Sequence, residues 1–255
     1  MSGNLCACCS DTLDAPVLAG PTSSGLCRVC RDEPPPFVRA VAYGPYQDHM
    51  KAAIHALKYD RLHAMARGLG RMLAQAIAQL ANEAPAEMLV VPVPLHRTKH
   101  AERGFNQARS LAAAALAELR ETHPEWRLTL APRTLMRLRA TESQAGLTPH
   151  KRRLNVRGAF EVIDSSLVKQ KHVLLIDDIF TSGATARAAA LALMRAGAAS
   201  VCVATLARAS RVYSNRRGET VRFDDVEDVA VMPGLVPAIA STHAGIYSSH
   251  EQSSF

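Results

Sequence analysis

The most informative segment of this chain reads VLLIDDIFTSGAT and runs from Val173 to Thr185. Its apolar first half is typical of a buried parallel strand, and its second half, rich in hydroxyls and small residues, is typical of a turn that opens a helix. The turn that follows a parallel strand is a common ligand site in α/β proteins. The segment therefore predicts an α/β fold with a ligand site at this turn.

The turn carries groups that suit a phosphate. Backbone N–H groups at the start of a helix attract a phosphate dianion, and Gly183 lets the backbone approach it closely. Hydroxyl side chains add donors and can cap the helix. The predicted phosphate-binding residues are Thr181, Ser182, Gly183, Ala184 and Thr185.

Two adjacent acids, Asp177 and Asp178, stand just before this turn. Carboxylates beside a phosphate repel it unless they face neutral hydroxyl groups or a metal ion. A vicinal diol such as ribose O2′ and O3′ would donate hydrogen bonds to them while the turn holds the 5′-phosphate, and Mg²⁺ would join sugar and pyrophosphate oxygens. The alternative is a simple strand–turn–helix with capping hydroxyls, which leaves both acids unexplained. The segment is neither a Walker A loop nor a GxGxxG loop.

Apolar strands alternate with helices around this segment. The strands are predicted at Phe37–Tyr46 (an edge strand or hairpin), Met88–Leu95, Arg127–Leu138, His172–Asp177 and Ser200–Leu206. The helices are predicted at His49–Tyr59, Leu62–Ala81, Asn106–Glu121 and Ala184–Ala196. Because this alternation is typical of parallel sheets, we expect an α/β sheet with helices on both faces.

Composition divides the chain into three parts. The Pro-rich linker Asp32–Pro36 cannot continue a helix or a central strand, so we expect an N-terminal unit at residues 1–36 and the α/β domain at residues 37–210. The pattern then decays, and residues 211–255 are expected to form a poorly ordered tail. No apolar run approaches the roughly 18 residues of a membrane span, and the start lacks a secretory signal. A soluble, cytoplasmic protein is the expectation.

The formal net charge of +7 is unevenly distributed. Residues 133–157 hold seven basic side chains against Glu142, and residues 96–109 hold four against Glu102. Both clusters lie in stretches punctuated by Gly, Pro and Asn, which favours a polyanion site over a solvated helix face. The polar connection Arg139–Asn155 exceeds the roughly 12 residues common in compact domains, so it is expected to be a lid or disordered.

Five of the six cysteines lie in the first 30 residues. Two CxxC pairs separated by 17 residues have the spacing of a zinc site, and the Pro- and Gly-rich loop between them has no apolar pattern with which to fold by burial. Disulfides would need an oxidising compartment, and a redox CxxC would need a thioredoxin-like setting. Cys8 is interpreted as a spare thiol and Cys202 as a buried strand residue. The predicted ligands of a structural zinc ion are Cys6, Cys9, Cys27 and Cys30.

Several motifs together resemble one known family. The segment Val173–Thr185 resembles the 5-phosphoribosyl-1-pyrophosphate (PRPP) signature of type I phosphoribosyltransferases. The double CxxC head, ALKY near Lys58, VPVPLH…RGFNQA (Val91–Ala108) and RLRATESQAGLTPHKRRLNVRGAF (Arg137–Phe160) narrow the resemblance to the ComF family, which is associated with natural competence. The resemblance implies a type I phosphoribosyltransferase-like sheet preceded by a small zinc-ribbon-like module.

The resemblance also implies roles for the basic segments. Residues 92–103 would form the pyrophosphate loop, with Pro92, Arg97, Lys99 and Arg103. The stretch Arg139–Asn155 would form a flexible hood that excludes water, with Arg137, Arg139 and Arg152 neutralising pyrophosphate. The implied catalytic set is Asp177, Asp178, Arg103, Arg139 and Arg152.

Two functions follow from these readings. One is Mg²⁺-dependent transfer of the phosphoribosyl group of PRPP to an acceptor that the sequence does not identify; no side chain declares itself a general base. The other is a non-catalytic competence accessory protein that handles single-stranded DNA beside a helicase-like partner. Aromatic side chains for stacking bases are scarce near the basic segments, where only Phe105 and Phe160 occur.

Overall fold

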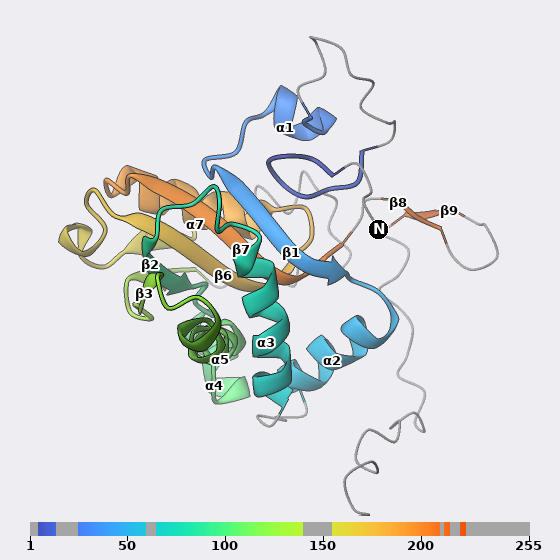
Figure 1. The fold of residues 1–255 in the computed structure, drawn as a ribbon, viewed down its shortest axis with the longest axis horizontal. Helices are drawn as coiled ribbons and strands as arrows, with labels where there is room; N and C mark the ends of the chain where they lie inside the picture. The colour runs from blue at the N-terminus through green and yellow to red at the C-terminus, as the bar shows by residue number, and fades with distance from the viewer. Residues whose placement is uncertain are drawn as a thin grey trace, which may run out of the picture.

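The computed structural model describes residues 5–13, 25–59, 65–139, 155–209, 212–214 and 220–222. Its centre is a five-stranded sheet in the order β1-β7-β6-β2-β3, in which every neighbouring pair is parallel (Figure 1). The strands are β1 (Arg39–Pro45), β2 (Glu87–Pro92), β3 (Arg127–Leu130), β6 (His172–Phe180) and β7 (Ser200–Arg208). The predicted parallel α/β fold is confirmed.

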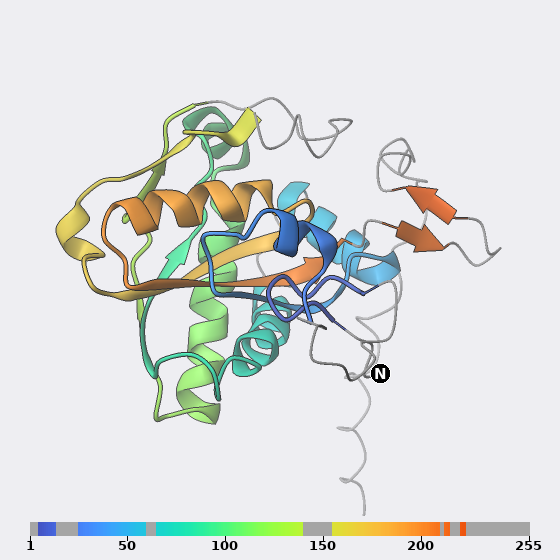
Figure 2. The ribbon, with the colours of Figure 1, turned by 90° about the horizontal axis from the view of Figure 1, so that it is seen from above.

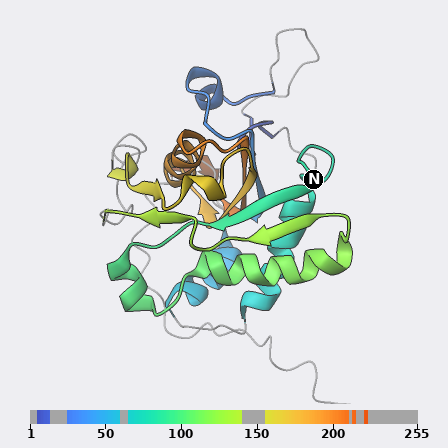
Figure 3. The ribbon, with the colours of Figure 1, turned by 90° about the vertical axis from the view of Figure 1, so that its left-hand side faces the viewer.

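Helices cover both faces of the sheet (Figure 2). On one face, α3 (Met65–Ala78) and α5 (Gln107–Thr122) bury their apolar sides against the sheet, and on the other face α7 (Ala184–Arg195) does the same. Two further helices, α2 (Asp48–Tyr59) and α4 (Arg97–Arg103), lie toward the carboxyl ends of the strands. Figure 3 looks onto the β3 edge, with α5 running along the sheet.

The two helices α3 and α5 touch at a glycine. A Cβ atom added to Gly70 would lie 2.3 Å from the Cβ atom of Ala114, so only glycine allows the helices this separation. The sequence around Gly68 and Gly70 does not predict this contact, because no local pattern marks packing against a helix that lies far along the chain.

The structure corrects two predicted elements. The strand expected at Arg127–Leu138 is two strands: β3 joins the main sheet, whereas β4 (Leu135–Arg137) pairs antiparallel with β5 (Phe160–Val162) in a separate hairpin-like layer. Pro132 lies between them, and proline interrupts strand pairing. The basic stretch after β2 contains helix α4, which begins after the cap residue His96 and ends at Gly104. A short 3-10 turn, η1 (Ser165–Leu167), precedes β6.

The cysteine-rich head packs directly on the sheet. It contains the short helix α1 (Arg28–Asp32), and its backbone joins strand β1, since Ala40 donates its N–H to the carbonyl of Cys8 and accepts a hydrogen bond from Ser10 Oγ (2.7 Å each). Buried cysteines share one apolar cluster with residues of β6 and α7. The head and the α/β domain are therefore packed as one body at this face, although the predicted boundary at residue 36 stays a prediction.

Two short strands lie within residues 211–255, where no regular element was expected. They are β8 (Val212–Ser214) and β9 (Thr220–Arg222), which pair antiparallel. The remainder of the expected tail lies outside the described residues, as does most of the expected hood, residues 140–154. None of the helices in the described part of the chain has both the length and the apolar character needed to cross a membrane.

Candidate functional site

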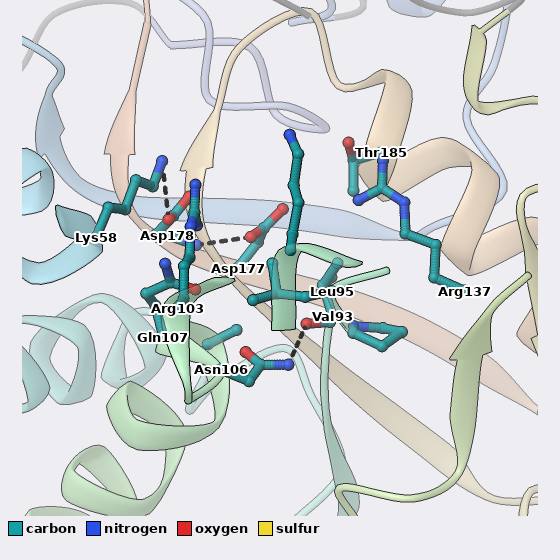
Figure 4. A pocket seen from close by; sticks show the side chains of 13 residues that line it. Lys58, Val93, Leu95, Arg103, Asn106, Gln107, Arg137, Asp177, Asp178 and Thr185 are labelled. Atoms are coloured by element: carbon teal, nitrogen blue, oxygen red, sulfur yellow. Dashed lines mark hydrogen bonds and ion pairs between the residues drawn. The ribbon is translucent and has the colours of Figure 1, made fainter. Parts of the chain in front are cut away.

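The carboxyl ends of β2 and β6 open into a cavity of about 170 Å³ (Figure 4). Strand β6 forms the floor of the cavity. The start of α5 and the residues after β2 form one wall, and α2 and β4 form the sides. The cavity is lined by Lys58, Val93, Pro94, Leu95, Lys99, Arg103, Asn106, Gln107, Ala108, Arg137, Asp177, Asp178 and Thr185. Both predicted acids thus lie in the crevice where an open α/β sheet binds its ligands.

The two acids differ in their partners. Strand β6 continues through both of them to Phe180, three residues beyond its expected end. Asp178 forms an ion pair of 2.9 Å with Lys58, and both side chains are mostly buried. Asp177 Oδ1 accepts the N–H of Asp178 at 2.9 Å. The acid pair is therefore held rigidly, with one carboxylate neutralised by a lysine and the other facing the cavity.

Their protonation follows from this arrangement. Burial, reinforced by the charge of Asp178, raises the pKa of Asp177 to about 7. Burial alone would lower the pKa of Lys58, but its attraction to Asp178 outweighs burial and raises the pKa. The site consequently contains the Lys58–Asp178 ion pair beside a carboxyl group, Asp177, that is poised between its two forms near neutral pH.

The predicted phosphate turn has a left-handed glycine at the start of α7. Gly183 has φ +77° and caps α7 in the left-handed conformation, and an added Cβ atom would meet the Phe180 ring at 2.6 Å. The first amides of α7 have no partner one turn earlier within the helix. Thr185 lines the cavity, whereas Thr181, Ser182, Gly183 and Ala184 do not.

Besides Lys58, three basic side chains reach the cavity: Lys99, Arg103 and Arg137. Burial, together with repulsion from the two arginines, lowers the pKa of Lys99. The cavity therefore gathers like charge from two separate segments, α4 and β4. A polyanion site there stays a prediction.

The other described residues predicted for the pyrophosphate loop and the hood do not line the cavity. Arg97 is exposed at the start of α4, and Pro92 is buried at the end of β2. Arg139 is exposed and donates a hydrogen bond to the carbonyl of Arg157. Arg152 lies outside the described residues.

Comparison with known proteins agrees with this geometry. Residues 106–236 match the family model described as the phosphoribosyl transferase domain. The DNA utilization protein YhgH of Salmonella typhi is 34% identical over 186 residues, which cover 71% of this chain and 77% of that protein. Competence protein F of Haemophilus influenzae is 26% identical over 214 residues, covering 80% of this chain and 90% of that protein.

This chain belongs to the ComF family of phosphoribosyltransferase-domain proteins. Competence protein ComFC of Bacillus subtilis is also similar, at 35% identity over 121 residues that cover 47% of this chain and 44% of that protein. A solved glutamine PRPP amidotransferase from B. subtilis aligns with 24% identity and a TM-score of 0.31, over 55% of this chain and 26% of that chain. The match to the phosphoribosyl transferase domain model and the parallel sheet confirm the fold class that the resemblance implies.

The head of this ComF-family chain gathers four sulfur atoms. Those of Cys6, Cys9, Cys27 and Cys30 all lie within 4.8 Å of one another, and Cys9 and Cys27 approach to 3.6 Å. Four thiolates around one zinc ion would be about 3.8 Å apart, given Zn–S bonds of about 2.3 Å. The four residues therefore fit a tetrahedral zinc ion and could bind it. Cys8 is buried but is not among the four.

The thiols of this cluster are electrostatically unlike one another. Burial opposes ionisation of Cys6, but backbone hydrogen bonds, including one from the N–H of Cys27 (3.2 Å), outweigh it and lower the pKa to about 7. Burial raises the pKa of Cys9 to about 12, although the nearby Arg208 charge acts in the opposite direction. Since a metal ion binds thiolates, zinc binding would release protons.

Sequence reasoning missed three residues of the ComF-family site: Lys58, Asn106 and Gln107. Asn106 caps α5 by accepting the N–H of Arg109 and donates its amide to the carbonyl of Val93 (3.0 Å), which joins the start of α5 to the residues after β2. Gln107 is only 2% exposed, and its Nε2 has no hydrogen-bond partner among the described residues. The motifs ALKY and RGFNQ contain all three residues, but a motif does not state which side chain points inward.

Proposed function

We propose that this chain binds PRPP in the cavity at the carboxyl ends of β2 and β6 and transfers its phosphoribosyl group to an acceptor. One observation carries the proposal. An acid pair and a cluster of cationic side chains, which would be incompatible around a simple anion, line the same cavity next to the start of α7. A molecule with a diol, a phosphate and a pyrophosphate satisfies all three features at once.

Each part of PRPP would have its own partners. Asp177 and Asp178 would accept hydrogen bonds from the ribose hydroxyl groups, since both carboxylates line the cavity. The turn from Thr181 to Thr185 would hold the 5′-phosphate with its amides and hydroxyls. Lys99, Arg103 and Arg137 would neutralise the pyrophosphate.

Magnesium fits this arrangement as a companion of the substrate. In the described residues the cysteine cluster alone brings together three or more side chains able to hold a metal ion. The acid pair would therefore need oxygens of PRPP to complete an octahedral shell. Bound in this way, Mg²⁺ would supply positive charge to the departing pyrophosphate.

The transfer breaks the C1–O bond to pyrophosphate and forms a bond from C1 to the acceptor. The sugar passes through an oxocarbenium-like state, so the protein's contribution would consist of alignment and of charge stabilisation on the leaving group. Lys99, Arg103 and Arg137 are placed for the second task. The acceptor's proton is not assigned to any described side chain.

Calorimetric titration with Mg²⁺–PRPP tests the proposal. We expect Asp177→Asn to weaken binding by about tenfold or more, the loss of about 1.4 kcal/mol that one charge-assisted hydrogen bond contributes. Glu121→Gln, the same chemical change at an exposed position of α5, serves as the matched control and should bind as the wild type does. The proposal is abandoned if the wild-type protein does not bind PRPP or if Asp177→Asn binds it equally well.

A second function, handling of single-stranded DNA during competence, is favoured by the names of two relatives, "DNA utilization protein" and "Competence protein F". The structure adds exposed arginines beside the site, Arg139 and Arg157. It offers little for base stacking, since Phe160 is buried and Phe105 packs against the core. DNA would therefore bind through phosphate contacts, with or without a helicase-like partner.

This second function predicts a strong salt dependence. Affinity for a single strand should fall steeply between low and moderate salt, because each neutralised phosphate releases counterions. Affinity that is insensitive to salt would contradict it. A reducing cytoplasm is the compartment proposed for either function, as all six cysteines are free thiols and four of them suit zinc.

A further inference from the structure

Arg208 is a buried charge that lies between the cysteine head and the phosphate turn. It ends strand β7, and its side chain is 7% exposed. Burying a guanidinium costs several kcal/mol unless its hydrogen-bonding groups and its charge find partners. The identity of those partners therefore indicates what the arginine does.

On one side Arg208 contacts the head. Its Nη2 forms an ion pair of 2.9 Å with Asp11, whose side chain is 8% exposed. Its Nε donates to the carbonyl of Cys9 at 3.1 Å, and Nη2 lies 4.0 Å from the Cys9 sulfur. Cys9 belongs to the four-sulfur cluster, so Arg208 occupies the position of an outer-shell partner of a bound metal.

On the other side Arg208 holds the start of the phosphate turn. Its Nη1 donates to the carbonyls of Phe180 (3.0 Å), Thr181 and Ala209 (2.9 Å). Its guanidinium stacks over the Phe180 ring, 4.6 Å from the ring centroid. That ring occupies the space into which a Cβ atom of Gly183 would project. The arginine thus determines where the turn begins and where the ring beneath its glycine sits.

We propose that Arg208 is a positioning residue that couples metal binding by the head to phosphate binding by the turn. A metal ion on the cysteines fixes Cys9, whose carbonyl, with Asp11, orients the guanidinium; the guanidinium in turn shapes Thr181–Gly183 to receive a phosphate. The inference rests on the proposed function, since the ligand is a ribose phosphate. The coupling is a free energy and acts equally in both directions.

If Arg208 only held the head in place, the protein would behave differently. The arginine would contribute stability, and its loss would lower the melting temperature, but phosphate would not alter metal affinity. The distinguishing readout is therefore the effect of one ligand on the other, measured as the ratio of two zinc affinities in the full-length chain.

The experiment is a zinc titration in competition with a chelator, with saturating ribose 5-phosphate or with ribose as the uncharged control. For the wild type we expect zinc to bind about 5-fold or more tighter with ribose 5-phosphate, within the usual range of coupling between sites. Arg208→Lys, which keeps the charge but loses the fork of donors, should reduce the ratio to about one. Asp11→Asn should reduce it too, and it leaves the carbonyl contacts in place if Arg208→Lys does not fold.

The outcomes distinguish failure of the coupling from failure of the proposed function. A wild-type ratio of one, in protein that binds ribose 5-phosphate, overturns the coupling and leaves the proposed function intact. If the ratio of zinc affinities stays above one in both variants, even with a lower melting temperature, Arg208 only stabilises the packing of the head. Wild-type protein that does not bind ribose 5-phosphate or PRPP overturns both.

Discussion

Gln107 combines two properties that conflict in a residue with a purely structural role. It is buried, yet its Nε2 donates no hydrogen bond, and it lines the cavity. An unsatisfied buried polar group costs about 1–3 kcal/mol. A bound ligand that offers an oxygen would remove this cost, which makes Gln107 a candidate contact to the substrate.

We therefore expect Gln107→Leu to weaken PRPP binding without destabilising the fold. The free energy of unfolding should stay equal or rise by about 1 kcal/mol, while affinity for PRPP should fall by about tenfold. Thermal unfolding and calorimetry measure the two quantities. Gln75→Leu, at an exposed position of α3, should not change PRPP binding. A clear loss of stability with unchanged affinity would show that Gln107 is a core residue.

Asp177 links the stability of the fold to pH. Its pKa is raised from 3.8 to about 7 by burial and by Asp178, so at intermediate pH the native chain binds a proton that the unfolded chain has lost. Stability must then fall as pH rises from about 4 to about 7. We expect Asp177→Asn to raise the free energy of unfolding at pH 8, by on the order of 1 kcal/mol, and to raise it less at pH 5.

Thermal unfolding at the two pH values checks this, with Glu121→Gln as the exposed control. The same Asp177→Asn change weakens PRPP binding in the proposed function, so the site would gain stability and lose its ligand together. If Asp177→Asn were less stable than the wild type at pH 8, the carboxylate would be holding the fold together, contrary to the electrostatic argument.

At the scale of elements, the contact between α3 and α5 depends on Gly70. Alanine normally favours a helix over glycine by about 1 kcal/mol. At Gly70 the added Cβ atom would meet Ala114 at 2.3 Å, whereas at Gly68, two residues earlier in the same helix, nothing lies within 4 Å. The two positions therefore separate intrinsic helix propensity from packing.

We expect Gly68→Ala to stabilise the protein by up to about 1 kcal/mol and Gly70→Ala to destabilise it by about 1–3 kcal/mol. Denaturant unfolding of the two variants measures the difference. Because α5 begins at the cavity wall, Gly70→Ala should also weaken PRPP binding slightly. Equal effects at both positions would mean that the helices adjust freely to each other.

At the scale of the whole molecule, the four-cysteine cluster that could bind zinc is part of the core and not an appendage. Its cysteines share an apolar cluster with β6 and α7, and the head's backbone is bonded to β1. We expect Cys30→Ser to lose the zinc ion and to lower the melting temperature of the entire chain, whereas Cys8→Ser should retain zinc. Zinc analysis and thermal unfolding measure both effects.

Chelation provides an independent check of the same point. Removing zinc from the wild type should reproduce the lower melting temperature of Cys30→Ser, since folding of the head is linked to metal binding. Zinc loss from Cys8→Ser, at the level of Cys30→Ser, would show instead that Cys8 is a ligand and that the first CxxC pair was misassigned.

Much of this architecture was predictable from local patterns. Apolar strands that alternate with helices are local signals, and they predicted the parallel sheet and nearly all of its strands. The acids of β6 and the glycine of the turn stand next to each other in the chain, so their convergence at one edge required no knowledge of the fold. The two CxxC pairs predicted their four-sulfur cluster because their spacing is that of a zinc site.

Only the tertiary structure decided which distant residues complete these sites. It brought Lys58 to Asp178 and Arg137 to the cavity, left Arg97 at the surface, and buried Arg208 between the head and the turn. The physical reason is that a residue's chemical type and its neighbours in the chain are local properties. Burial, ion pairing and access to a cavity depend instead on how separate elements pack together.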